Sequence, residues 1–575
     1  MPSEPKPSAR SALLESTTPA RPPHPTLLCA LDAGAREDVP WLTLHNTEAK
    51  AEPKTLSLRQ LRESAHRYAH LLHNSGVQRG DRVLLLLPTG SAFIEAMLGT
   101  MLAGAVPVPL AGNLTFGAVE RYLHNLKGIA DSAEARLLIT SGRMRETIAG
   151  SAELCERFRH VLTPESLEGL GVHQGLWPSI SETDTAFIQY TSGTTGKPKG
   201  AVISHRALVS NAYGIAHGLQ IGPESVGISW LPLFHDMGLI GVVLTSIAHP
   251  YPIHLMPPER FVMQPRGWLE LIAKARGTLT AGPNFAYEMA VARSGGPLES
   301  LDLSCMRTML NGAEPVHEAT LERFINHYAP ARLRNDVMLP VYGLAESTLA
   351  VAFPSLDKRL HSMRVDREAL ESQGRAIPSD SPQARSLVSV GVPLAGTSFG
   401  IFDDTGQLLP EGEVGEIRVR SASLMDGYFH NEEASREALS DGELRTGDLG
   451  VIRNGLLYVT GRKKDLIIKG GRNIHPYDVE RIAERVNGMR MGGIAAFARP
   501  NPKTGTDDLV LAAETMDADD ATRERIQREI RGEVLAVLGV KVDDVHFCRV
   551  GTLPRTTSGK LKRKACATLF TRSEA

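Results

Sequence analysis

Apolar residues in the first part of the chain alternate between the spacing of a helix and that of a buried strand. One set has helical spacing and predicts an amphipathic helix over 58–72: Leu61, Ala65, Tyr68, Ala69 and Leu72. A near-continuous apolar run over 82–87 follows, which is typical of a strand buried on both faces. A helix over 92–102 and a strand over 105–109 come next, and the alternation recurs from Thr185 to about Leu349. This order predicts an α/β fold with a layered architecture.

The last part of the chain has a different pattern. A helix over 477–486 precedes strands over 493–498 and 509–514, and a helix over 520–538 stops at Gly539. This pattern predicts a small α+β domain, with its boundary at the charged turn Gly461-Arg462-Lys463-Lys464-Asp465. We therefore expect three parts: a polar, proline-rich and disordered tail over 1–25, a large N-terminal domain over 26–461 and a small C-terminal domain over 466–575.

Composition narrows the class of protein. A chain of 575 residues with 42% hydrophobic and 22% charged residues fits a soluble globular protein of two or more domains. The net charge of −2 leaves no basic excess for a nucleic acid. Five dispersed cysteines lack metal-ligand spacing and fit reduced thiols in the cytoplasm. The most apolar stretch, 96–111, is too short for a membrane span, and no signal core precedes it.

A loop rich in hydroxyls and glycines joins the apolar runs 186–190 and 201–203. Glycines let backbone N–H groups approach an anion, hydroxyls donate further hydrogen bonds, and lysines add positive charge. The Walker loop is excluded, because it needs Gly where Thr191 stands and Ser or Thr where Pro198 stands. The loop predicts a different polyphosphate site, with a flexible hairpin tip as the alternative. Its candidate ligand-binding residues are Thr191, Ser192, Gly193, Thr194, Thr195, Gly196 and Lys197.

This loop resembles the phosphate loop of the adenylate-forming superfamily: acyl-CoA synthetases, peptide-synthetase adenylation domains, luciferases and fatty acyl-AMP ligases. Further stretches resemble the motifs of that superfamily in the same order: Asn311-Gly312-Ala313-Glu314-Pro315, Tyr342-Gly343-Leu344-Ala345-Glu346, Arg445-Thr446-Gly447-Asp448-Leu449, Gly461-Arg462 and Pro554-Arg555-Thr556-Thr557-Ser558-Gly559-Lys560. The resemblance extends from about Leu56 to Lys564. It implies a large adenylation domain, a small mobile lid domain, and ATP with Mg²⁺.

The resemblance also implies a role for each motif. The loop Gly312-Ala313-Glu314 and the stretch Tyr342-Gly343-Leu344-Ala345 would face the nucleotide, with the Tyr342 ring on adenine. Glu346 would hold the Mg²⁺ that screens the phosphates. Asp448 would accept both ribose hydroxyls, and Arg462 would lie near ribose and phosphates. Lys560 would stabilise the charge that develops at the α-phosphate, and Lys464 or Asp465 would be the hinge. Considered singly, Tyr342, Glu346 and Lys560 could be ordinary core or surface residues.

The implied reaction has two halves. A carboxylic acid and MgATP first give an acyl-adenylate and pyrophosphate, which needs positioning and charge stabilisation by groups such as Thr191 but no protein nucleophile. A thiol then attacks the adenylate carbonyl after the small domain has swung about its hinge.

Two features indicate which branch of the superfamily the chain resembles. His235 stands where peptide-synthetase domains carry an acid that pairs with an amino group, which argues against an α-amino acid, although Asp236 is adjacent. About 44 residues separate Glu346 from the turn at Gly391, and this segment, near 350–390, resembles the insertion of fatty acyl-AMP ligases, which is proposed to hinder the swing that CoA needs. The alternative for the insertion is a solvated loop without a role in acceptor choice.

We therefore expect a ligase that activates a fatty or other hydrophobic acid and transfers it to a separate acyl carrier protein. A CoA ligase of the same fold is the alternative. A third possibility is a nucleotide or acyl-adenylate sensor without catalysis, against which Lys560, Glu346, Asp448 and Arg462 argue.

Overall fold

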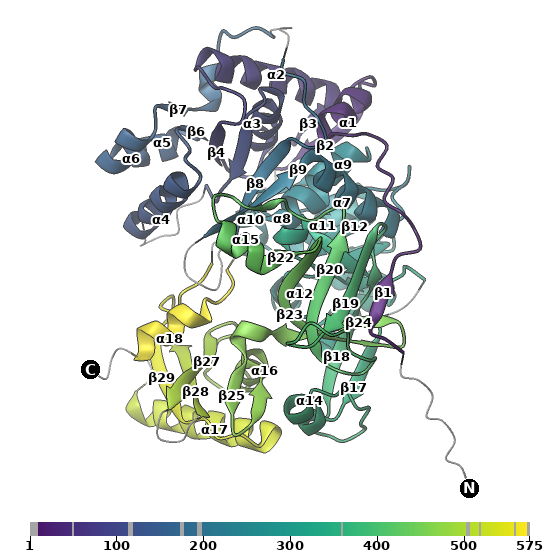
Figure 1. Ribbon diagram of the computed structural model, residues 1–575, viewed down its shortest axis with the longest axis vertical. Helices are drawn as coiled ribbons and strands as arrows, with labels where there is room; N and C mark the ends of the chain where they lie inside the picture. The colour runs from purple at the N-terminus through teal and green to yellow at the C-terminus, as the bar shows by residue number, and fades with distance from the viewer. Residues whose placement is uncertain are drawn as a thin grey trace.

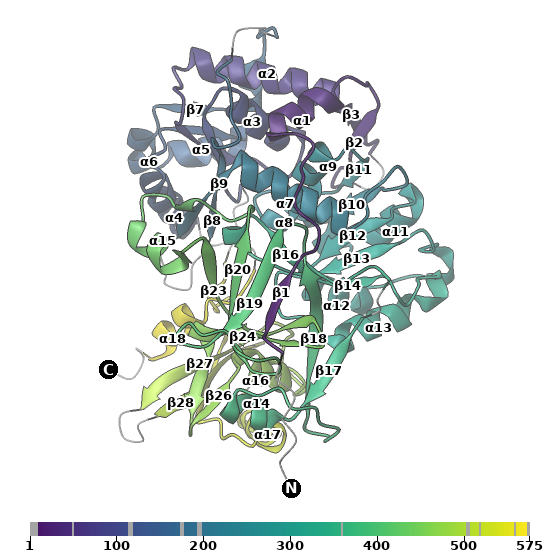
Figure 2. The same cartoon turned by 45° about the vertical axis from the view of Figure 1, so that its right-hand side comes forward.

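The computed structural model describes residues 10–48, 51–112, 119–172, 177–191, 198–357, 360–501, 506–516, 519–556 and 559–571. Helices and sheets alternate in layers through most of this chain, and a smaller group of elements from its C-terminal part lies below them (Figures 1 and 2). The predicted α/β class is therefore confirmed.

A mostly parallel sheet, which we call the central sheet, lies in the middle of the large part. Its strand order is β14 (Met338–Pro340), β13 (Thr308–Asn311), β12 (Leu279–Gly282), β10 (Gly227–Ser229), β11 (Ile253–Leu255), β2 (Pro40–Leu44) and β3 (Lys54–Ser57). One face packs on α10 (Pro258–Met263), α11 (Arg266–Ala275), α12 (Asn284–Ala292) and α13 (Glu318–Tyr328) around buried aromatic rings. The other face packs near α7 (His205–Gly218), the π-helix η2 (Leu239–Leu244) and α9 (Thr245–Ala248). The carboxyl ends of β12, β13 and β14 share one edge, where ligands of parallel sheets usually bind.

A second parallel sheet, the outer sheet, contains the first predicted strands. Its order is β5 (Val106–Pro109), β4 (Arg82–Leu86), β6 (Leu137–Thr140) and β7 (His160–Leu162). Helices α2 (Leu58–Asn74) and α3 (Ser91–Leu102) pack together beside it. The predicted helix begins where Ser57 and Gln60 form a reciprocal capping box, which satisfies two of the free N–H groups at the helix start.

The antiparallel sheet combines the first strand of the chain with many later ones. Its order is β1 (Leu13–Glu15), β19 (Thr397–Phe402), β20 (Gly415–Ser421), β23 (Glu443–Arg453), β24 (Leu456–Arg462), β18 (Arg385–Pro393), β16 (Ala350–Phe353) and β15 (Tyr342–Gly343), with β17 (Ser362–Val365) and β22 (Leu439–Ser440) at its sides. The expectation of a disordered tail over 1–25 is wrong for its described part. Leu13, Leu14 and Glu15 pair with Gly400, Phe399 and Ser398, because β19 offers a free strand edge and Ala12 becomes fully buried there.

The C-terminal elements form a small sheet of β27 (Ile494–Asn501), β28 (Thr506–Thr515) and β29 (Asp544–Arg549) with its own apolar core. Helix α17 (Asp520–Leu538) has the predicted bounds, because Asp519 caps its start and Gly539 takes a left-handed φ of 64° at its end. Helix α16 (Pro476–Ala483) ends earlier than predicted, although Val486 remains buried.

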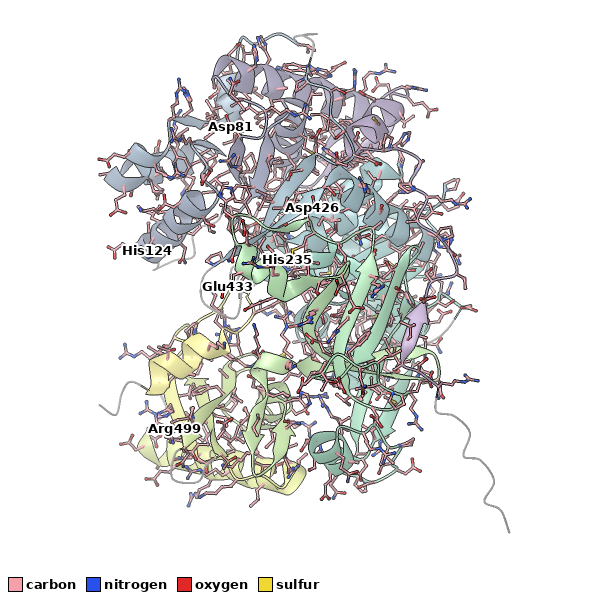
Figure 3. All side chains as sticks on the ribbon, viewed as in Figure 1. Asp81, His124, His235, Asp426, Glu433 and Arg499 are labelled. Carbon is pink, nitrogen blue, oxygen red and sulfur yellow. The ribbon has the colours of Figure 1, made fainter. Side chains whose placement is uncertain are left out.

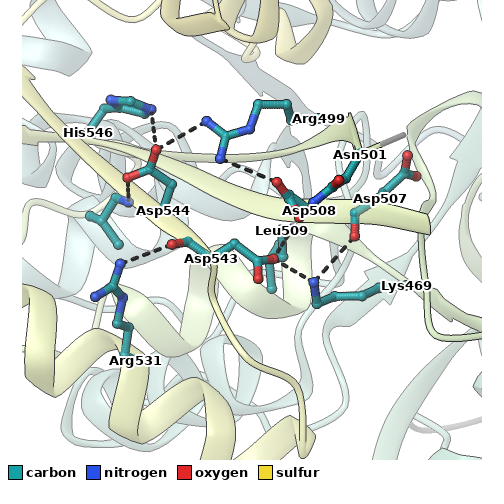
Figure 4. A network of polar contacts seen from close by, with 11 residues as sticks. Lys469, Arg499, Asn501, Asp507, Asp508, Leu509, Arg531, Asp543, Asp544 and His546 are labelled. Carbon is teal, nitrogen blue, oxygen red and sulfur yellow. Dashed lines mark hydrogen bonds and ion pairs between the residues drawn. The ribbon is translucent and has the colours of Figure 1, made fainter. Parts of the chain in front are cut away.

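A polar network ties this small sheet to its neighbours (Figure 4). Asp543 pairs with Lys469 of β25 (Ile467–Lys469) and accepts the Leu509 N–H at 2.7 Å. Arg531 of α17 donates to the Asp543 carbonyl at 3.0 Å. The network therefore joins a strand, the sheet and a helix through one aspartate. In the described part of the chain, no helix is long and apolar enough to cross a bilayer.

Candidate functional site

A cavity of about 1990 Å³ lies between the carboxyl edge of the central sheet, the antiparallel sheet and the small C-terminal part. In Figure 3, His235 lies near the level where the large and small parts meet. Most of the predicted site residues line this cavity: Thr191, His235, Ala313, Glu314, Tyr342, Gly343, Leu344, Ala345, Glu346, Asp448, Arg462 and Lys560. Gly312 is adjacent to it but does not line it, and Ser192 to Lys197 lie outside the described residues.

Tyr342, Asp448 and Arg462 form one hydrogen-bonded group on the cavity wall. Antiparallel pairing sets Asp448 of β23 opposite Arg462 of β24, and the Arg462 Nε donates to Asp448 Oδ1 at 3.0 Å. The Tyr342 hydroxyl donates to Asp448 Oδ2 at 2.8 Å. The adjacent Asp448 carboxylate raises the pKa of Arg462, and burial raises the pKa of Tyr342 well above its ordinary value. Each carboxylate oxygen has two lone pairs, so Asp448 can still accept two hydroxyls of a ligand.

Glu346 lies on a short 3₁₀ turn, and its Oε1 accepts the Tyr428 hydroxyl at 2.8 Å. Two residues later, Thr348 has φ 62° and ψ −61°, the geometry of a γ-turn, and the Leu349 N–H donates to the Ser347 carbonyl at 2.7 Å. A β-branched residue with positive φ is strained, and here the Thr348 hydroxyl is held by the Ser423 carbonyl at 2.7 Å. The sequence contains no signal for this turn or for the support that Tyr428 gives.

Glu314 comes from the loop after β13. A side chain at Gly312 would meet Val341 Cγ2 at 2.7 Å, so the loop can pass β14 only with glycine there. Ala313 follows with φ 69°. Glu314 Oε1 accepts the Phe285 N–H at 2.8 Å at the start of α12, and burial raises the pKa of Glu314. These contacts fix an acidic side chain at the cavity wall.

Lys560 reaches the same cavity from the C-terminal part of the chain. Its N–H donates to Thr556 Oγ1 at 3.0 Å, and the Thr556 N–H donates to the Lys560 carbonyl at 2.7 Å, which closes a tight loop. The side chain keeps access to solvent inside the cavity, although protein surrounds it. Removal from bulk water lowers the pKa of Lys560, while the carboxylates of Asp236, Glu314 and Asp448 oppose that shift.

His235 contacts Asp236, with 2.7 Å between Nδ1 and Oδ1. Burial disfavours the charged form of Asp236, but His235 and Lys560 outweigh burial, so the pKa of Asp236 lies below its ordinary value. Thr191 ends β8 (Thr185–Thr191), and its hydroxyl donates to the Lys199 carbonyl at 3.4 Å. Lys199 also lines the cavity, with its ammonium 5.0 Å from the centre of the Tyr428 ring. Asp236, Lys199 and Tyr428 are therefore residues of the site to which the sequence assigned no role.

The insertion is folded and contacts the small C-terminal part. Its helix α14 (Arg367–Gln373) carries Glu371, which is only 2% exposed and pairs with Arg472 of β26 (Arg472–Ile474). Asp478, at the start of α16, has Arg385 at 3.1 Å and Arg367 at 3.5 Å. The insertion is therefore not a solvated loop.

A second group of contacts joins the start of α13 to the small C-terminal part. The Tyr477 and His317 rings stack with centroids 4.6 Å apart, and Arg481 Nη1 donates to His317 Nδ1 at 2.6 Å. Burial and the neighbouring Arg481 lower the pKa of His317 to about 3, so its ring is neutral. Arginine side chains, the Asp478 carboxylate and the neutral His317 ring thus lie at one interface.

Known proteins resemble this chain over nearly its whole length. The family described as "AMP-binding enzyme" matches residues 36–429. A putative acyl-CoA synthetase of Caulobacter vibrioides is 34% identical, over 95% of this chain and 95% of its own. The medium-chain-fatty-acid–[acyl-carrier-protein] ligase JamA of Moorena producens is 32% identical, over 90% of each chain. A solved structure from work on fatty acyl-adenylate ligases of E. coli and L. pneumophila has a TM-score of 0.90 at 32% identity, covering 96% of this chain and 99% of that one.

Proposed function

Because the chain belongs to the AMP-binding enzyme family of adenylate-forming acid ligases, we propose that it converts a fatty or other hydrophobic carboxylic acid to acyl-AMP and transfers the acyl group to a carrier protein. The acceptor is the phosphopantetheine thiol of a separate carrier. We assign the choice of acceptor to the contacts between the insertion and the C-terminal part. We assign adenylation to the residues that line the cavity.

Adenylation depends on charges that are already in place. Asp448 and Arg462 hold the ribose, and the Lys560 ammonium stabilises the negative charge that develops when the acid attacks the α-phosphorus and pyrophosphate leaves. The residues around Lys560 fit this role, since three carboxylates oppose the lowering of its pKa by burial. A positioned acid and nucleotide need no protein nucleophile.

Glu346 fits a magnesium ligand. The carboxylate lines the cavity, and Tyr428 holds its Oε1, so the group is oriented before any ligand binds. Mg²⁺ in nucleotide sites is commonly bound through one or two carboxylates and the phosphates of the nucleotide, and Glu346 would supply such a carboxylate. When bound, the ion would screen the repulsion between the phosphates and the attacking carboxylate.

Acceptor choice rests on the cost of moving the small part of the chain. A swing about Lys464 or Asp465 would separate Glu371 from Arg472, and Asp478 from Arg367 and Arg385. Breaking a buried ion pair costs about 3–5 kcal/mol when one charge stays uncompensated. A carrier protein can offset this cost with contacts to the protein surface that free CoA does not make.

A CoA ligase is the second candidate, because one relative that is similar over nearly the full length is a putative acyl-CoA synthetase. The two candidates differ in acceptor alone. The buried contacts of the insertion favour the carrier protein.

An end-point assay separates the candidates. The purified protein is incubated with MgATP and a panel of carboxylic acids, with no acceptor, with CoA, or with a pantetheinylated carrier protein, and products are read by mass spectrometry. Acyl-AMP that accumulates beside CoA, together with acyl-carrier when the carrier is added, is the expected result. Efficient acyl-CoA formation would replace the proposal with the second candidate.

A further inference from the structure

The large cavity has an apolar arm that follows the central sheet away from Lys560. Residues of α7, of the π-helix η2 and of the sheet line this apolar arm, among them Ile215, Val242 and Leu279. Gly241 of η2 also lines it, and a side chain there would reach Leu349 Cδ2 at 3.0 Å. The glycine therefore keeps the arm open where it leaves the site.

The strand register shows where the arm ends. Gly227 pairs with Leu279 on one side and with Ile253 on the other, and each of these residues begins its strand. They therefore mark the amino edge of the central sheet, whereas Glu314 and Tyr342 follow the carboxyl ends of β13 and β14. A strand rises about 3.3 Å per residue, so the two edges are about 10 Å apart. An acid whose carboxylate lies near Lys560 would point its other end at the amino edge.

Tyr251 lies at that end. A side chain at Gly227 would meet Tyr251 Cε2 at 3.0 Å, so the phenol ring occupies the room that the glycine leaves. Tyr251 is 6% exposed and lines the cavity, and burial raises the pKa of its hydroxyl, which stays protonated.

The Tyr251 hydroxyl has no hydrogen-bond partner among the described residues. Buried hydroxyls nearly always have a partner. The Thr280 hydroxyl, which lies in the same arm, shows the usual situation: it donates to the Ile228 carbonyl at 2.8 Å and accepts from Trp268 Nε1 at 3.0 Å. The end of the apolar arm thus presents a hydroxyl that is left to bond water or a ligand in the cavity.

We propose that Tyr251 is a specificity-determining residue, and that the site prefers an acid whose distal end carries a hydroxyl over a plain alkyl acid of equal length. This inference rests on the proposed adenylation of an acid at this site. An alkyl chain that fills the arm displaces water from the Tyr251 hydroxyl and leaves it unpaired, whereas a terminal hydroxyl restores the hydrogen bond. Sites that hydrogen-bond a substrate hydroxyl discriminate strongly against analogues that lack it.

The test uses straight-chain acids in matched pairs, one ending in a methyl group and one in a hydroxyl, over a range of chain lengths. The ratio of kcat/KM for pyrophosphate release within each pair is measured for the wild type, Tyr251→Phe and Tyr213→Phe. We expect the wild type to favour the hydroxy acid at least about tenfold at one chain length. Tyr251→Phe should bring that ratio close to one, mainly because the plain acid is used better.

Tyr213→Phe is the matched control. It also removes one phenol hydroxyl, but Tyr213 lies on α7 and does not line the cavity. Its ratio should equal that of the wild type. An unfolding curve verifies that Tyr251→Phe is folded. Equal use of both acids by the wild type, or an unchanged ratio in Tyr251→Phe, would overturn the inference. Failure of the proposed function would give a different result. No acyl-carrier product would form from any acid, and this outcome does not depend on the ratios of pyrophosphate release.

Discussion

The pair between Glu371 and Arg472 gives a sharp test of acceptor choice. Glu371 is 2% exposed, and the Arg472 side chain is about a quarter exposed, which places the pair between a buried and a surface ion pair. Glu371→Gln removes the charge while nearly keeping the shape. Arg472 retains its bond to the Leu538 carbonyl at 2.9 Å, so the loss should lie at or below the low end of the range for buried pairs, about 2–3 kcal/mol.

This free energy favours the closed arrangement of the two parts, so its loss should ease the swing. At 1.4 kcal/mol for each factor of ten, the opening equilibrium should rise about 30- to 140-fold. The assay is acyl-CoA formation from enzyme-bound acyl-adenylate after CoA is added, followed by rapid quench. We expect a comparable rise in that rate, with pyrophosphate release close to the wild type.

Glu368→Gln is the matched control, because Glu368 lies exposed on the same helix. It should behave like the wild type in both assays. Glu371→Gln with an unchanged rate of CoA transfer and unchanged adenylation would refute the idea that this pair restrains the acceptor step. Loss of adenylation itself would instead show that the pair supports the closed, adenylating arrangement.

Three further predictions concern chemistry and stability. Lys560→Ala should slow pyrophosphate release about 10²- to 10³-fold while ATP binding, measured by calorimetry, changes little; unchanged turnover would refute the role of this lysine. His317 and His475 are neutral in the fold, each with its pKa lowered to about 3 by burial and by neighbouring arginines, so the unfolded chain takes up more protons below about pH 6.5. Stability should therefore fall as the pH is lowered from about 6.5 towards 3, which urea unfolding at several pH values checks, and His475→Gln should weaken that dependence. Asp543→Ala should reduce the free energy of unfolding by about 1–3 kcal/mol, because Lys469 and the Leu509 N–H lose their partner, and an unchanged urea midpoint would contradict this.

Local rules of sequence predict much of this fold. Helix α17 could be bounded from its cap Asp519 and from Gly539, and α2 from the spacing of its apolar residues. The fold also brings together most of the described residues predicted for the site, although their individual roles stay predictions. Resemblance of motifs was essential here, since Tyr342 and Asp448 are 106 positions apart and no local rule links them.

Other features depend on partners far away in the chain and leave no local trace. The strain at Thr348 follows from the fit of its loop against Ser423. The ion pair between Glu371 and Arg472 needs a folded insertion beside the C-terminal part. The unpaired Tyr251 hydroxyl can be recognised only when the cavity wall is assembled. Such contacts arise from tertiary packing, which overrides or adds to local preference.

The pairing of β1 with β19 has a consequence for the order of events during synthesis. Leu13 leaves the ribosome early, but its partner Gly400 is made almost four hundred residues later. Contacts between such distant positions form late, and an uncovered strand edge invites pairing with another chain in the meantime. The polar, proline-rich composition of residues 1–25 suits a segment that must remain unpaired until its partner strand has been synthesised. Strand β1 can thus join the antiparallel sheet only after β19 has been made, and its arrival covers the free edge of β19.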